Sequence, residues 1–228
     1  MTVDGFPGIG IFAEATAGAV DGADLVVMAV KPQQMREAAT ALAPYIADVP
    51  VVLSIAAGTR IADLSRWLGG YSRIARAMPN TPALVGAGVS GAFAPIEVSA
   101  AGRKLAGRVL ESAGAVVWVD REDMLDAVTG VSGSGPAYVF YFLEGLEQAA
   151  RELGFSSADA RKLAYTTFAG AVKLAQASDL EPAILRAQVT SKGGTTERAL
   201  TMMEADGVKA KFIAAVKAAA VRAQELGK

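Results

Sequence analysis

Two patterns of hydrophobic residues divide the chain. Between residues 23 and 121, short apolar runs that suit buried strands alternate with segments whose apolar residues recur every three or four positions, as in helices. After Glu122 the strand-like runs stop, and the segments that follow have the helical spacing. The first half therefore predicts a parallel sheet with helical crossovers, and the second half an all-helical region. We place the domain boundary near residue 121, which gives domains 1–121 and 122–228.

Strand-like and helix-like segments alternate through the first half. The predicted strands cover residues 23–30, 49–56, 72–79 and 115–120, and the predicted helices cover residues 32–46, 59–70 and 97–114. Ahead of them, residues 11–24 predict a short strand and a turn. In the second half, several predicted helices are apolar over most of their circumference, and such helices need more partners than a small bundle supplies. We therefore expect the second half to form oligomers.

The residue types that are missing restrict the chemistry. The sequence contains no histidine and no cysteine. Hydrolysis by a Ser-His-Asp or Cys-His arrangement is therefore excluded, and a zinc site would have to use carboxylates alone. We expect no metal site, and we expect chemistry from hydroxyls, carboxylates, lysine or a bound cofactor. The lack of cysteine fits a reducing compartment, so we expect a cytoplasmic protein.

Charge and hydropathy argue against two classes of partner. The formal net charge is −1, which gives no electrostatic reason to expect binding to nucleic acid. No apolar run reaches the roughly 18 residues of a membrane span, so we expect no membrane partner. The N-terminal segment has no basic region before an apolar stretch, and so it is not expected to be a secretory signal.

One glycine motif resembles a dinucleotide-binding turn. Residues 8–13 match the pattern G-x-G-x-x-A, which binds pyrophosphate when it follows a strand and opens a helix. Only seven residues precede the motif here, among them Gly5 and Pro7, and a strand and turn are predicted after it. We therefore interpret the match as a chance occurrence.

Two loops follow predicted strands of the first half. Ligands in open α/β sheets lie outside the carboxyl ends of the strands. Lys31, followed by Pro32, could face a phosphate or ribose there, or it could be a solvated lysine in an ordinary connection. Residues 76–82 (RAMPNTP) form a stiff loop with two polar side chains, Asn80 and Thr81. Such a loop suits ligand positioning, although prolines in loops commonly only shape a turn.

Two further motifs belong to the helical half. In residues 132–136 (SGSGP), Ser134 is a candidate N-cap and Pro136 lies near the first helical position, while the two glycines suggest close approach of another backbone or a ligand. Residues 189–196 (VTSKGGTT) precede a predicted helix. Hydroxyls and glycines there present N–H groups toward one point, which favours a phosphate or carboxylate. The alternative is an ordinary helix cap beside a lysine.

Together these motifs resemble the pyrroline-5-carboxylate reductase family. Segments 25–33, 54–61, 76–91, 126–138 and 189–200 occur in that family's order and spacing. The combination of MPNTP, SGSGPAY and S-x-G-G-x-T makes the resemblance specific, and it extends from about residue 10 to the end of the chain. It implies an α/β plus all-α fold, in which an incomplete Rossmann-type parallel sheet is followed by a helical dimerisation domain. The implied reaction reduces the C=N bond of 1-pyrroline-5-carboxylate to L-proline, the last step of proline biosynthesis, with NADPH or NADH.

The resemblance also implies roles for individual residues. The substrate carboxylate would be held by Ser191, Gly193, Gly194 and Thr195, while the hydroxyl of Thr196 would contact the ring nitrogen as the catalytic group. Glu122 matches a family position that contacts the product proline. Positions that line the cofactor cleft would be Val30, Lys31, Pro32, Ala57, Met78, Asn80 and Thr81. Each site would combine one subunit's nucleotide domain with the partner's helices, in a homodimer or an assembly of dimers.

Two departures from the family's pattern count against transferring the family's activity to this chain. Family members begin with a βαβ segment of roughly 30 or more residues, and this sequence does not contain it. The pyrophosphate cradle and the loop that reads the ribose 2′ position are then missing, and Thr16 stands where the family usually has asparagine. We therefore expect weak or no reductase activity from this chain, unless an artificially shortened sequence or a misassigned start codon explains the gap. The exposed sheet edge would be an aggregation liability.

Two other functions compete with the reductase. One is a non-catalytic remnant that oligomerises through its helical half or binds proline-like ligands. An upstream reading frame that encodes a strand and a G-x-G-x-x-G turn would argue against it. The other is a two-domain reductase of the hydroxyacid dehydrogenase type. Those enzymes typically carry a catalytic lysine on the long helix, and residues 136–150 contain none.

Overall fold

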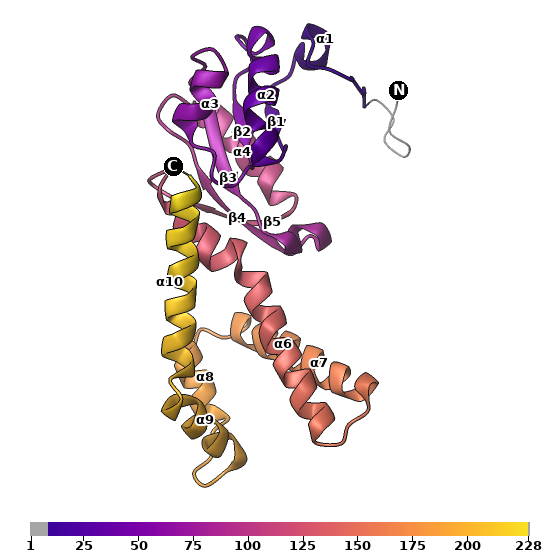
Figure 1. The fold of residues 1–228 in the computed structure, drawn as a ribbon, viewed down its shortest axis with the longest axis vertical. Helices are drawn as coiled ribbons and strands as arrows, with labels where there is room; N and C mark the ends of the chain where they lie inside the picture. The colour runs from indigo at the N-terminus through magenta and orange to yellow at the C-terminus, as the bar shows by residue number, and fades with distance from the viewer. Residues whose placement is uncertain (1–8, 228) are drawn as a thin grey trace. The chain divides into compact units, whose positions relative to one another are not determined.

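The computed structural model describes residues 9–227, which divide into two units (Figure 1). The first unit combines residues 9–134 with residues 217–227, and the second is Gly135–Val216. This division follows spatial contacts, whereas the boundary near residue 121 was drawn from sequence patterns and stays a prediction. None of the described helices is long and apolar enough to cross a membrane.

A five-stranded sheet lies in the first unit, within the described residues. The strands are β1 (Val26–Met28), β2 (Val52–Ser54), β3 (Ile74–Met78), β4 (Gly88–Phe93) and β5 (Gly114–Trp118), and they lie in chain order across the sheet. Neighbouring strands are parallel except for the antiparallel pair of β3 and β4. The four predicted strands are confirmed, three of them with narrower bounds and the fourth beginning one residue earlier and ending two earlier, and the predicted Rossmann-type fold class is confirmed. Strand β4 was not predicted, and its antiparallel pairing is a departure from an all-parallel sheet.

Helices cover both faces of this sheet (Figure 1). Alternation along the strands sends Val52 and Ile74 to one face, where they pack in a core with α2 (Pro32–Leu42) and α3 (Ile61–Trp67). The residues between them, such as Leu53 and Ala75, face a second core with α4 (Ala100–Glu111). Short 3₁₀ turns follow α2 and β3, at Ala43–Tyr45 (η1) and Thr81–Val85 (η2). The carboxyl ends of β1, β2 and β3 therefore emerge at one edge between two helical layers.

The segment before β1 differs from its prediction. Residues 9–16 form neither helix nor strand, and a short helix, α1 (Ala17–Val20), takes the place of the predicted strand. Gly8 of the G-x-G-x-x-A match lies outside the described residues, and the described part of that motif does not open a helix. Strand β1 pairs with β2 and, among the described strands, with no other. The side chain of Val27 in this edge strand is 41% exposed.

A π-helical turn links the sheet to the long helices. The chain passes from α5 (Met124–Val128) through the π turn η3 (Thr129–Gly133) into α6 (Gly135–Glu152). Ser134 has helical dihedral angles, and its N–H donates to the carbonyl of Thr129 at 2.8 Å. The prediction of Ser134 as an N-cap is therefore wrong, because the helical path is continuous there and an N-cap requires a non-helical backbone.

The second unit is helical throughout, as predicted. It contains α6, α7 (Ser157–Gln176), α8 (Pro182–Gln188), α9 (Thr195–Ala205) and the first part of α10 (Val208–Leu226). The ring of Phe212 on α10 lies 5.7 Å from those of Tyr138 and Phe142 on α6, measured between centroids. Among the described side chains of this unit, only Leu143, Ala160 and Ala164 are buried. The unit therefore exposes much apolar surface.

Candidate functional site

A pocket of about 240 Å³ lies in the first unit at the carboxyl ends of the strands. Its walls include Pro32, Ala57 and Met78, three of the predicted cofactor residues. Pro32 begins α2 just after β1, Ala57 follows β2, and Met78 ends β3. The carboxyl ends of neighbouring parallel strands meet at one edge of a sheet, which brings these three residues together although they are far apart in sequence.

The other predicted cofactor residues do not line this pocket, although each is close in sequence to a residue that does. Val30 and Lys31 precede α2 and are exposed, and the side chain of Lys31 does not cap that helix. The Asn80 amide donates to the carbonyl of Ser132 at 3.2 Å, and its oxygen accepts from the N–H of Val89 at 2.9 Å. Thr81 starts the turn η2 and is exposed. Asn80 thus fixes the loop between β3 and β4 against the π turn.

A cluster of four charged side chains borders the same pocket. Arg76 on β3 donates from Nη1 to Oε1 of Glu122 at 2.6 Å, and Arg60 pairs with Asp126 at 2.6 Å. The same Oε1 of Glu122 accepts from the backbone N–H of Ile61 at 2.8 Å, which places a carboxylate at the start of α3. Both Arg76 and Asp126 line the pocket.

Arg76 is the most buried member of this cluster. Its side chain is 4% exposed, and burial lowers the pKa of the guanidinium while the hydrogen bond to Glu122 acts in the opposite direction. Arg76, Arg60 and Asp126 were not predicted as site residues from the sequence. One signal was available for Arg76, because it stands alone as a charge inside the apolar strand segment IARAM.

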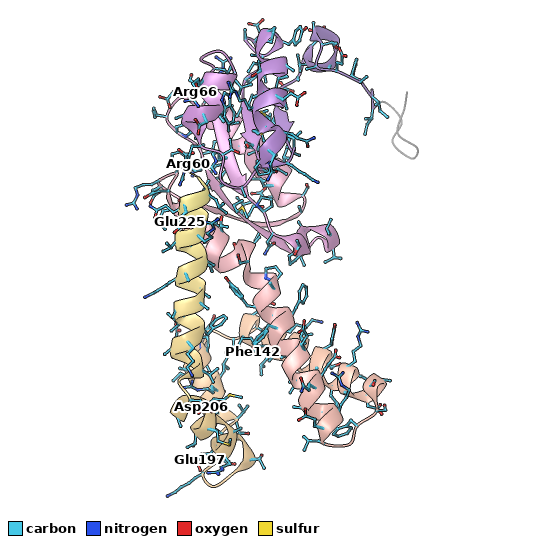
Figure 2. The ribbon with its side chains drawn as sticks, in the orientation of Figure 1. Arg60, Arg66, Phe142, Glu197, Asp206 and Glu225 are labelled. Atoms are coloured by element: carbon cyan, nitrogen blue, oxygen red, sulfur yellow. The ribbon has the colours of Figure 1, made fainter. Side chains whose placement is uncertain are left out.

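The predicted substrate residues form one turn of the second unit. Gly193 has φ +73°, a left-handed conformation, and its N–H donates to Oε2 of Glu197 at 2.6 Å. The N–H of Gly194 donates to the carbonyl of Ser191 at 3.0 Å, and α9 begins at the next residue. Glu197, which sequence reasoning missed, lies on α9 three positions past this N-cap glycine (Figure 2). An acidic residue at that position is a known capping signal.

The geometry of this turn fits an anion site. Ser191, Gly193, Gly194, Thr195 and Thr196 follow one another at the start of a helix, where the first N–H groups have no acceptor within the helix. A β-carbon on Gly194 would lie 2.5 Å from the hydroxyl oxygen of Ser191, so a larger residue would disturb the turn. The carboxylate of Glu197 already accepts one of the N–H groups of this turn. Among the predicted substrate residues, Glu122 belongs to the other unit.

Comparison with known proteins identifies the family. A family model described as pyrroline-5-carboxylate reductase dimerisation matches residues 122–226. The pyrroline-5-carboxylate reductase of Pseudomonas aeruginosa is 45% identical over 213 residues, which cover 93% of this chain and 78% of that protein. The enzyme of Synechocystis is 40% identical over 210 residues, covering 92% of this chain and 78% of its own length. The chain belongs to the pyrroline-5-carboxylate reductase family.

Solved structures of the pyrroline-5-carboxylate reductase family have the same fold. The reductase from Coxiella burnetii superposes with a TM-score of 0.88 at 39% identity, over 93% of this chain and 79% of that one. The Plasmodium falciparum pyrroline carboxylate reductase, solved with NADP bound, superposes with a TM-score of 0.85 at 30% identity, over 93% of this chain and 80% of that one. The helical half matches a family model for dimerisation. This match indicates that the chain forms homo-oligomers through that half.

Proposed function

We propose that this protein reduces the C=N bond of 1-pyrroline-5-carboxylate to L-proline, with NADPH or NADH as the hydride donor. The observation that carries the proposal is the 45% identity to the Pseudomonas aeruginosa reductase across 93% of this chain. The chemistry also agrees with the composition. Reduction of a small imine needs a hydride, a proton and a site for one carboxylate, so the lack of histidine and cysteine is no obstacle.

The pocket of the first unit fits one end of the cofactor. Its volume of about 240 Å³ is smaller than the roughly 300–1,000 Å³ of sites that enclose a whole drug-sized ligand. Apolar walls from Ala57, Met78 and Leu125, with Arg76 and Asp126 as polar groups, suit a flat ring that carries an amide. When bound, the cofactor supplies the hydride. The chain would hold it with Val30, Lys31, Pro32, Ala57, Met78, Asn80 and Thr81.

The turn before α9 is the proposed substrate site. Ser191, Gly193, Gly194 and Thr195 would hold the substrate carboxylate, the two hydroxyls and the first N–H groups of the helix as donors and the two glycines as the turn that aligns them, because a helix N-terminus favours an anion. The Thr196 hydroxyl would orient the ring nitrogen and stabilise its protonated form. The family resemblance also assigns Glu122 to the product, although in this structure one of its carboxylate oxygens accepts two hydrogen bonds from the protein.

We further propose that the protein works as a cytoplasmic homodimer or as an assembly of dimers, with no nucleic-acid partner. The helical unit exposes large apolar side chains, among them Tyr141 at 72% and Leu174 at 60%. Apolar surface of this kind marks a protein interface. A mass measurement by light scattering at several concentrations checks the assembly, and a monomer at every concentration would contradict it.

The reaction is tested by following NADPH and NADH oxidation with 1-pyrroline-5-carboxylate. The assay uses the purified 228-residue chain and a chain extended upstream in the same reading frame. We expect turnover in at least one of them, and we expect Thr196→Ala to lower kcat/KM by about 10- to 100-fold, because one transition-state hydrogen bond is lost. Thr201→Ala is the matched control, since that hydroxyl donates to the carbonyl of Glu197 on the same helix.

Two results would contradict the proposal. Folded chains that oxidise neither nucleotide in the presence of 1-pyrroline-5-carboxylate would favour the non-catalytic remnant. Equal losses in Thr196→Ala and Thr201→Ala would instead mean that the helix, and not the Thr196 hydroxyl, is what the reaction needs.

A further inference from the structure

The end of α10 forms part of the wall of the pocket in the first unit. Ala223 and Leu226 lie three positions apart on this helix, hence on one face of it, and both line the pocket. Ala223 is buried, whereas Leu226 keeps 65% of its surface exposed, so apolar surface remains available to a ligand there. The pocket therefore joins the carboxyl ends of the strands to the last turn of a helix that is distant in sequence.

The loop between β2 and α3 meets this last turn backbone to backbone. Gly58 in the loop has φ +74°, and a β-carbon on it would lie 3.3 Å from the carbonyl oxygen of Leu226. From the other side, a β-carbon on Gly227 would lie 3.0 Å from Nε of Arg60 and 3.2 Å from the carbonyl oxygen of Gly58. These distances are shorter than ordinary van der Waals contacts of a β-carbon. Glycine on both sides therefore permits the close approach.

Arg60 connects three segments that surround the pocket (Figure 2). It is the residue just before α3, its Nε donates a long hydrogen bond to the carbonyl of Gly227 at 3.4 Å, and its Nη2 donates to Oδ2 of Asp126 on α5 at 2.6 Å. The last carbonyls of a helix lack donors within the helix, and a cation beside them is stabilising. One guanidinium therefore holds the loop, the end of α10 and α5 together.

We propose that the last turn of α10 is a wall of the cofactor pocket and that Arg60 is the positioning residue that keeps this wall in place. Taking this pocket as the cofactor site rests on the proposed function. Leu226 packs against the bound nucleotide, and Arg60 acts through Gly227 and Asp126 without touching it. The competing possibility is that Arg60 acts through Asp126 alone and that the end of α10 contributes nothing to nucleotide binding.

Fluorescence titration with NADPH measures nucleotide binding without turnover, on whichever of the 228-residue and extended chains binds it. We expect Arg60→Gln to raise the Kd for NADPH by about 3- to 10-fold, because the hydrogen bonds of the guanidinium are lost. Leu226→Ala should raise it by about 2- to 5-fold, since apolar contact area is removed. The Kd for L-proline, measured by calorimetry, should change less than about twofold in both variants.

A double-mutant cycle with Gly227→Val separates the two routes of action. A valine side chain would push the last turn away from Arg60 and from the carbonyl of Gly58, so this variant should also raise the Kd for NADPH. Arg60→Gln combined with Gly227→Val should raise it by clearly less than the product of the two single effects, because both substitutions break the same contact. If Arg60 acts through Asp126 alone, the two effects multiply.

Amide hydrogen exchange reports on the wall directly. Bound NADPH should slow exchange at residues 223–227 of the wild type, because the nucleotide covers this turn. Arg60→Gln should speed exchange at the same residues in the free protein, because the tie to the carbonyl of Gly227 is gone.

Two substitutions on the same helices are matched controls. Arg66→Gln removes an exposed arginine of α3 that pairs with Asp63, and Val221→Ala shortens a 55% exposed side chain of α10 that does not line the pocket. Both should leave the Kd for NADPH unchanged. Thermal unfolding checks that every variant is folded, and Arg60→Lys replaces Arg60→Gln if the latter does not fold.

Contrary outcomes separate this proposal from the proposed function. A Kd for NADPH that does not respond to Leu226→Ala or to Gly227→Val would overturn the wall, and multiplying effects in the cycle would overturn the role of Arg60. A wild type that binds no NADPH in either form would overturn both. If the wild type binds NADPH but does not reduce 1-pyrroline-5-carboxylate, the proposed reaction fails, while the Kd values still decide whether the end of α10 is a wall of the nucleotide site.

Discussion

Single hydrogen bonds fix several buried side chains of the first unit, and Tyr71 is the clearest case. Its hydroxyl donates to the carbonyl of Val49 at 2.8 Å, and the residue is buried. Burial raises the pKa of Tyr71, although the neighbouring Arg73 opposes the shift through a hydrogen bond and its charge. A raised pKa means that the folded chain keeps the proton at a pH where the unfolded chain loses it. The stabilisation is therefore complete below the unfolded pKa of about 10 and is lost as the pH rises through the folded pKa.

Tyr71→Phe should remove this contribution. We expect the free energy of unfolding to fall by about 1 kcal/mol near neutral pH, because one hydrogen bond to a buried carbonyl disappears. Above pH 10 the difference between wild type and variant should shrink, as the wild type loses its own contribution. Denaturant titrations at the two pH values measure this, with Tyr45→Phe, at a 38% exposed position, as the control. A gap that stays constant with pH would contradict the assignment.

At the level of elements, the π turn η3 packs closely against α10. A β-carbon on Gly130 would lie 2.8 Å from the backbone nitrogen of Ala220, and backbone atoms cannot move aside as a side-chain tip can. Gly135, at the start of α6, differs sharply, since a β-carbon there would meet no atom of the described chain within 4 Å. The packing therefore requires a glycine at position 130 and does not require one at position 135.

This contrast gives a paired prediction. Gly130→Ala should destabilise the protein by roughly 1–3 kcal/mol, because it overpacks a helix contact. Gly135→Ala should be neutral or slightly stabilising, since alanine favours a helix over glycine. Thermal unfolding of both variants under identical conditions is the measurement. Equal destabilisation of the two variants would mean that the close approach to Ala220 is not what requires a glycine at position 130.

For the molecule as a whole, strand β1 forms one of the two edges of the sheet in the first unit. β1 ends the sheet among the described strands, and Val27 is 41% exposed there. Unpaired edge strands invite pairing with other chains. Val27→Lys should therefore slow aggregation of this chain, as followed by light scattering at constant temperature. Val109→Lys on α4 adds the same charge at an exposed valine away from the edge, and it should have less effect. Equal protection by both variants would trace the effect to net charge.

Much of this architecture could be predicted from hydrophobic patterning, and the exceptions have physical causes. Strand β4 (Gly88–Phe93, GVSGAF) consists mainly of small residues and lacks an apolar run, and its pairing with β3 decides its structure. The convergence of Pro32, Ala57 and Met78 followed from topology, because parallel strands end at one edge. The partner of Arg76 could not be predicted in this way, since Glu122 lies 46 positions along the chain and only the folded sheet brings them together.

The return of α10 to the first unit has a consequence for biosynthesis. Residues 217–227 belong to that unit, where Ala220 packs against the π turn. Just past the end of α10, the carbonyl of Gly227 accepts a hydrogen bond from Nε of Arg60 at 3.4 Å (Arg60 is labelled in Figure 2). A ribosome makes the whole helical segment before it makes these residues. The sheet domain therefore cannot complete its contacts while translation proceeds, and during that interval it is exposed to chaperones and to pairing at its open edge.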